Sequence, residues 1–135
     1  MANSLIMMAT TTNSSILANG IVPLSTIVRR RGQVLTNNNN SIVMNRPGYY
    51  KVNATITFTS SATGTATIKA QKNGVDLVGM TASTTIATAT TEVRSLAISG
   101  IVRVMCSEGF GTLTLVNSGI TITSSNVEID VEYLG

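Results

Sequence analysis

Short segments in which apolar and polar residues alternate recur along the chain, and this feature limits the fold more than any other. In residues 49–59, every second residue from Tyr50 to Phe58 is apolar, and the residues between them are mostly polar. A period of two is that of a half-buried β-strand, because successive side chains point to opposite faces. No window shows the sustained period of an amphipathic helix. The sequence therefore predicts an all-β protein.

The same alternation returns in residues 65–71 and 127–133, while residues 92–105 are partly apolar in both phases, and turn sequences separate these segments. Asn73-Gly74 is one such turn, because this pair tolerates the positive φ angles of a tight hairpin. Residues 81–91 consist almost wholly of Thr, Ala and Ser, and they predict a weak strand followed by a mobile loop. The spacing predicts about ten short strands, as in a sandwich or barrel.

The length of 135 residues fits one domain, which we expect to span residues 20–135. Residues 1–19 show no clear alternation, and we expect them to form an N-terminal arm outside the core. The large apolar side chains of this arm are Leu5, Ile6, Met7, Met8, Ile16 and Leu17. Burial of such side chains by a partner is favourable in free energy, so we expect the arm to anchor the chain on a larger assembly. Its removal is then expected to leave the fold intact.

The composition argues against an enzyme. The chain contains no His, which is the commonest general base and a frequent metal ligand. Cys106 is the only cysteine, so the chain can form neither an intrachain disulfide nor a thiolate zinc site. We expect no catalytic residue, no cofactor and no membrane segment, and we see no signal peptide.

Two charged clusters are candidate contact sites. Arg29, Arg30 and Arg31 can grip an acidic capsid surface, pair with carboxylates of another subunit, or form a solvated turn. Nucleic acid is an unlikely partner, because no aromatic platform or second basic cluster accompanies them. Glu128, Asp130 and Glu132 share one face of the last strand. They can be solvated, meet arginines of a neighbouring subunit, or hold a calcium ion with help from carbonyl groups.

Residues 92–105 are apolar on both faces, since Leu96, Ile98 and Val102 alternate with Ala97 and Ile101. A single sandwich core buries only one face of a strand. An exposed apolar face of this size normally marks an interface, and we therefore expect the chain to associate with itself.

The order of these signals resembles the globular head of complement recognition proteins, whose ten-strand jelly roll is shared with tumour-necrosis-factor-like ligands. The residues that carry the resemblance are Arg46-Pro47-Gly48-Tyr49-Tyr50, Lys72-Asn73-Gly74 and Gly109-Phe110-Gly111. Similar heads occur in phage virion proteins. The resemblance implies a ten-strand jelly-roll sandwich that forms a homotrimer around an axis lined by one sheet.

A head with a short arm, without a collagen stalk or secretion signal, resembles a phage head fibre or capsid decoration protein. The expected function is that of a non-enzymatic structural protein of the virion, made in the host cytoplasm and bound to the major capsid protein or another virion protein. The alternative is a receptor- or glycan-binding head of a phage tail or bacterial surface fibre. In that case, loops such as residues 81–91 or 107–111 would bind the glycan or host receptor.

Overall fold

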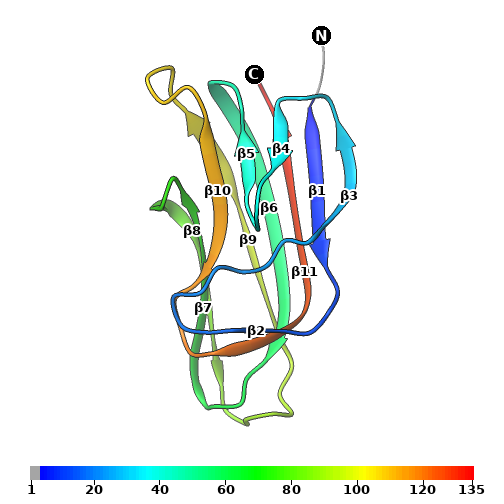
Figure 1. Ribbon diagram of the computed structural model, residues 1–135. Helices are drawn as coiled ribbons and strands as arrows, with labels where there is room; N and C mark the ends of the chain where they lie inside the picture. The colour runs from blue at the N-terminus through cyan, green and yellow to red at the C-terminus, as the bar shows by residue number, and fades with distance from the viewer. Residues whose placement is uncertain (1–3) are drawn as a thin grey trace.

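The computed structural model describes residues 4–135, which fold into two antiparallel β-sheets packed face to face (Figure 1). The strands are β1 (Leu5–Thr10), β2 (Ser14–Ile16), β3 (Thr26–Arg31), β4 (Leu35–Asn37), β5 (Ile42–Met44), β6 (Gly48–Thr59), β7 (Gly64–Lys72), β8 (Val75–Ile86), β9 (Arg94–Val104), β10 (Gly111–Asn117) and β11 (Ile122–Tyr133). The described residues contain no helix that is long and apolar enough to cross a membrane. The prediction of an all-β sandwich is confirmed.

The first sheet has the strand order β3-β1-β11-β6-β9, with β2 paired to one end of β11. The second has the order β4-β5-β10-β7-β8. The long strands β6, β9 and β11 form the centre and one flank of the first sheet, whereas β3 forms its other edge. Figure 1 shows that the start of β1 and the end of β11 lie at the same end of the sandwich as the β9–β10 loop.

The core lies between the two sheets and follows the predicted alternation. Along β6, the buried residues Tyr50, Val52, Ala54, Ile56 and Phe58 all face inward. On the neighbouring strand β9, Gly100 stands opposite Val52. A Cβ atom added at Gly100 would lie 3.0 Å from the Met80 side chain. The glycine therefore leaves the space that Met80 of the second sheet fills.

The predicted arm is wrong as a structural element. Residues 5–10 form β1, which pairs with β11 on one side and with β3 on the other. Ile6 and Met8 are fully buried in the core, and Ile16 of β2 is buried with them. The boundary at residue 19 therefore does not separate an arm from the head, because both strands before it belong to the first sheet.

The sequence of β1 concealed its alternation because both of its faces are apolar. Ile6 and Met8 point into the core, and Leu5 and Met7 lie half-buried on the opposite face. Apolar residues on both faces look like a continuous run, which periodicity alone cannot assign to a strand. A half-buried outer face also raises the question of what covers it.

The two loops proposed as recognition loops lie at opposite ends of the sandwich (Figure 1). The strand β9 joins them, because residues 87–93 precede it and residues 105–110 follow it. Residues 81–86 belong to β8 and not to a loop. The two segments therefore cannot contribute to one binding apex of the same chain.

Candidate functional site on the outer face of the first sheet

The outer face of the first sheet, called face A here, is formed by the side chains that point away from the core. Its members are Leu5, Met7 and Ala9 of β1; Glu128, Asp130 and Glu132 of β11; Tyr49, Lys51, Asn53 and Thr55 of β6; and Ala97, Ser99, Ile101 and Arg103 of β9. The strand register arranges them in rows across the sheet, because directly paired residues point to the same face. One row runs Leu5, Glu132, Lys51 and Ile101, and the next runs Met7, Asp130, Asn53 and Ser99.

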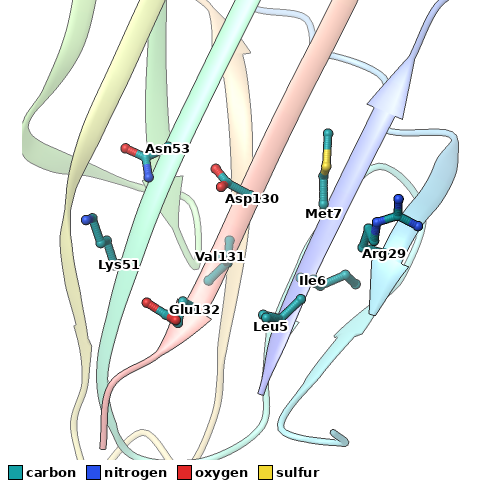
Figure 2. A pocket seen from close by; sticks show the side chains of 9 residues that line it. All are labelled: Leu5, Ile6, Met7, Arg29, Lys51, Asn53, Asp130, Val131 and Glu132. Carbon is teal, nitrogen blue, oxygen red and sulfur yellow. The ribbon is translucent and has the colours of Figure 1, made fainter. Parts of the chain in front are cut away.

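A hollow of about 390 Å³ opens on face A between β1 and β6. Figure 2 shows Asp130 between Asn53 and Met7, with Arg29 of β3 beyond Met7. Leu5 and Met7 give the hollow an apolar side, and Asp130 and Lys51 give it opposite charges. The predicted carboxylate ladder thus lies in the middle of a partly apolar surface and not at a solvated edge.

The carboxylates of face A differ from all other carboxylates of the chain. Asp76, Glu92 and Glu108 each form an ion pair with a basic residue of the same chain. Within residues 4–135, Glu128, Asp130 and Glu132 form none. One oxygen of Asp130, Oδ1, is inaccessible to solvent and has no hydrogen-bond partner in the described part of the chain. Buried carboxylate oxygens are normally hydrogen-bonded, so this atom lacks a donor.

Burial also changes the pKa values of two face A carboxylates, Glu128 and Asp130. Desolvation raises the pKa of Glu128, and the negative charge of Asp130 raises it further. Desolvation is also the largest influence on Asp130 and raises its pKa, while a hydrogen bond from its own backbone amide and the charge of Lys51 act in the opposite direction. Both shifts have the same physical reason, since a partly buried carboxylate loses water that stabilises its charge.

Large apolar side chains are exposed on the β6–β9 flank of face A. Ile101 is 58% exposed and Tyr49 is 45% exposed. The guanidinium carbon of Arg103 lies 5.5 Å from the centre of the Tyr49 ring, which is the geometry of a cation–π contact. Arg103 forms no ion pair within residues 4–135. This flank therefore presents an aliphatic side chain, an aromatic ring and a positioned cation.

The arginine cluster lies in a strand and not in a turn. Arg29, Arg30 and Arg31 belong to β3, which pairs with β1 on one side only, and all three are exposed. Charged side chains on an edge strand hinder pairing with the edge of another sheet. This structural role by itself assigns no ligand to the cluster, and Arg29 also borders the hollow of face A.

The other predicted anchoring residues are divided between core and surface. Ile6, Met8 and Ile16 are buried in the core, Leu5 and Met7 lie on face A, and only Leu17, at 66% exposure, is freely accessible. Ile6, Met8 and Ile16 therefore cannot contact a particle without unfolding the sheet.

The sequence prediction missed that Leu5 and Met7 belong to a sheet face beside the β11 carboxylates, and that Lys51 stands directly opposite Glu132. Alternation alone shows which residues share a strand face, but the strand order places β1 next to β11. The apolar phase of Ile101 was the one signal in the sequence that pointed to this surface.

Face A shows no arrangement for metal binding or catalysis. In the described residues, no three Asp, Glu or Cys side chains gather closely enough to hold a metal ion. Cys106 is exposed and lies in the loop after β9. The polar groups of the hollow belong to an open sheet surface, so they form no closed pocket around a nucleophile and its base.

The fold is that of the tumour-necrosis-factor-like jelly-roll proteins. Murine APRIL superposes with a TM-score of 0.75 at 14% sequence identity, over 98% of this chain and 99% of the other. The globular domain of a zebrafish complement 1qA protein gives a TM-score of 0.69 at 6% identity, over 98% of both chains. The vertex protein P5 of PRD1 gives 0.62 at 16% identity, over 100% of this chain and 99% of that one. No family model matches the sequence, and no curated protein is similar to it in sequence.

Proposed function

We propose that the protein is a non-enzymatic structural component of a virion, built as a homotrimer whose copies meet through face A. The observation that carries the proposal is the state of this face. It combines exposed apolar residues such as Ile101 with Glu128, Asp130 and Glu132, which form no ion pair within residues 4–135. A surface of this kind is typical of an interface.

The occupant of face A is proposed to be a second copy of the chain. The jelly-roll resemblance implies a trimer around an axis lined by one sheet, and the exposed apolar residues favour the first sheet. The outer face of the second sheet carries instead small hydroxyl residues such as Thr65 and Thr67, with Ser83 bound to Thr67. The exposed apolar residues of the second sheet, Val75 and Val78, lie only on its edge strand β8, close to the Asn73-Gly74 turn.

A virion is the proposed location because the fold covers 99% of the solved chain of the PRD1 vertex protein P5. A fold is shared by proteins of many functions, so this likeness supports the proposal without deciding it. The absence of His from the sequence and the open form of the hollow both favour a structural role over an enzymatic one.

Attachment to the particle is proposed to use the β3 edge. Arg29, Arg30 and Arg31 are exposed there and pair with no carboxylate of residues 4–135. Guanidinium groups bind carboxylates through two parallel hydrogen bonds, so an acidic patch of the major capsid protein or another virion protein is the expected partner.

A receptor- or glycan-binding head is the second candidate, favoured by the β9–β10 loop. Phe110 is 56% exposed on this loop. Glu108 fixes the loop by accepting hydrogen bonds from the Met105 amide and from Lys72 Nζ. A preorganised aromatic side chain is a common feature of binding loops.

The proposal is tested with two matched threonine variants, each of which adds one charge to an outer sheet face. Thr55→Asp changes face A, and Thr65→Asp changes the second sheet; both threonines are exposed. We expect light scattering to show trimers for Thr65→Asp and smaller species for Thr55→Asp, with both variants folded. Trimers of equal stability for the two variants would contradict an interface at face A.

The virion role is tested by electron microscopy of particles made with and without the gene. We expect a threefold projection that is missing without the gene, and whose occupancy falls when Arg29, Arg30 and Arg31 are replaced by Gln. Particles that keep full occupancy with this variant but lose host binding with Phe110→Ser would favour the receptor-binding candidate.

A further inference from the structure

The face A carboxylates can pair only with basic residues that have no ion pair of their own. Six basic residues form no ion pair within residues 4–135, and they are Arg29, Arg30, Arg31, Arg46, Lys51 and Arg103. Lys51 stands directly opposite Glu132 on the neighbouring strand, and its charge already lowers the pKa of Asp130 in the same chain. Arg103 has no carboxylate neighbour of this kind, because its cross-strand partner is Tyr49.

A ring of three copies restricts which parts of face A can meet. Copies related by a threefold axis form a head-to-tail interface, in which one flank of a copy contacts the opposite flank of the next. The strand order places β3, β1 and β11 on one flank of the first sheet and β6 and β9 on the other. In such a ring, the β11 carboxylates of one copy would face the β9 flank of its neighbour, which carries Ile101 and Arg103.

The two flanks are complementary in both polarity and charge. The β1–β11 flank offers the half-buried Leu5 and Met7 beside the unpaired Asp130. The β6–β9 flank offers the exposed Ile101 and the Arg103 guanidinium, which the Tyr49 ring holds in place. Apolar contacts would surround the charged groups, which is where an ion pair with good geometry is worth most and an unpaired charge costs most.

We infer that Arg103 of one copy pairs with the accessible side of the Asp130 carboxylate of the next copy, so that three such ion pairs set the register of the trimer. This inference rests on the proposed assembly through face A and adds to it the residues that match the two flanks. Arginine fits this role, because its planar guanidinium can donate two hydrogen bonds to one carboxylate.

A charge-swap experiment tests the pair. The single variants Asp130→Arg and Arg103→Asp place like charges together, and each should raise the chain concentration of half-assembly by at least about tenfold. The double variant restores opposite charges and should return this concentration to within about threefold of wild type. Arg30→Asp is the matched control, because it makes the same charge change at an exposed position outside face A. It should assemble like wild type.

Sedimentation equilibrium gives the assembly state, and circular dichroism shows that each variant is folded. A double variant that assembles as weakly as the single variants would overturn the ion pair. A trimeric wild-type chain would in that case still support the proposed function. A wild-type monomer at every concentration would overturn both. If Asp130→Arg fails to fold, Asp130→Asn replaces it in the experiment. Weaker assembly of Asp130→Asn than of wild type would support the ion pair. Tighter assembly at neutral pH would show that the β11 carboxylates of the three copies repel one another, and it would overturn the ion pair.

Discussion

Asn117 shows how one buried polar side chain joins segments that are distant in the sequence. Its Nδ2 donates to the carbonyl oxygens of Ile16 and Ile120 at 3.1 and 2.9 Å, and its Oδ1 accepts from the Gly119 amide at 3.0 Å. The side chain is completely buried. The sequence predicts only a turn at residues 117–119, because nothing local shows that β2 lies beside this turn.

Replacing Asn117 by Ala should destabilise the fold by about 2–3 kcal/mol, because the buried carbonyl groups lose their donor. The measurement is the free energy of unfolding from urea denaturation. Asn126→Ala serves as the control, because Asn126 is exposed in β11. An Asn117→Ala protein as stable as this control would show that water replaces the side chain.

At the scale of elements, the sequence predicts strands well where their two faces differ. The alternation of β6 indicates its buried face correctly from Tyr50 to Phe58, as burial confirms. It fails for β1, where Leu5 and Met7 on the outer face are as apolar as Ile6 and Met8 on the inner one. The acidic ladder of β11 was predicted as a shared face, but its neighbours depend on strand order, which no local pattern contains.

Deleting residues 1–18 tests the corrected role of β1 and β2. Three core side chains, Ile6, Met8 and Ile16, would be lost, each worth roughly 1.5–3 kcal/mol when buried. Such a loss is comparable to the total stability of a typical domain. We expect no cooperative thermal transition from the truncated chain. Leu17→Ser, at an exposed position, should melt like wild type, and a truncated chain that also does so would contradict the assignment of β1 to the core.

At the scale of the whole molecule, the inferred ion pair makes assembly depend on pH. In the free chain, burial raises the pKa of Glu128 and Asp130. In the trimer, the Arg103 guanidinium would lower the pKa of Asp130 relative to the free chain, with Lys51 and Arg29 as the other cations at the hollow and Glu132 as the nearby anion. A carboxylate whose pKa is lowered by assembly stabilises the trimer above its free-chain pKa, and this contribution is lost as the pH falls.

We therefore expect the concentration of half-assembly to rise as the pH is lowered from 7, while circular dichroism shows that the chain stays folded. The Asp130→Asn variant should show a weaker dependence, because it removes the titrating group. Assembly of wild type that strengthens in acid would contradict this expectation and would indicate that like charges converge at the axis.

The proposed trimer requires that three copies of the chain meet through face A. The most direct test is the mass of the wild-type chain at micromolar concentration and neutral pH, measured by light scattering or sedimentation equilibrium. We expect a mass three times the chain mass of 14.1 kDa. A mass of one chain at every concentration would contradict this, because Ile101 and Tyr49 would then remain uncovered and the face A carboxylates unpaired in the functional protein.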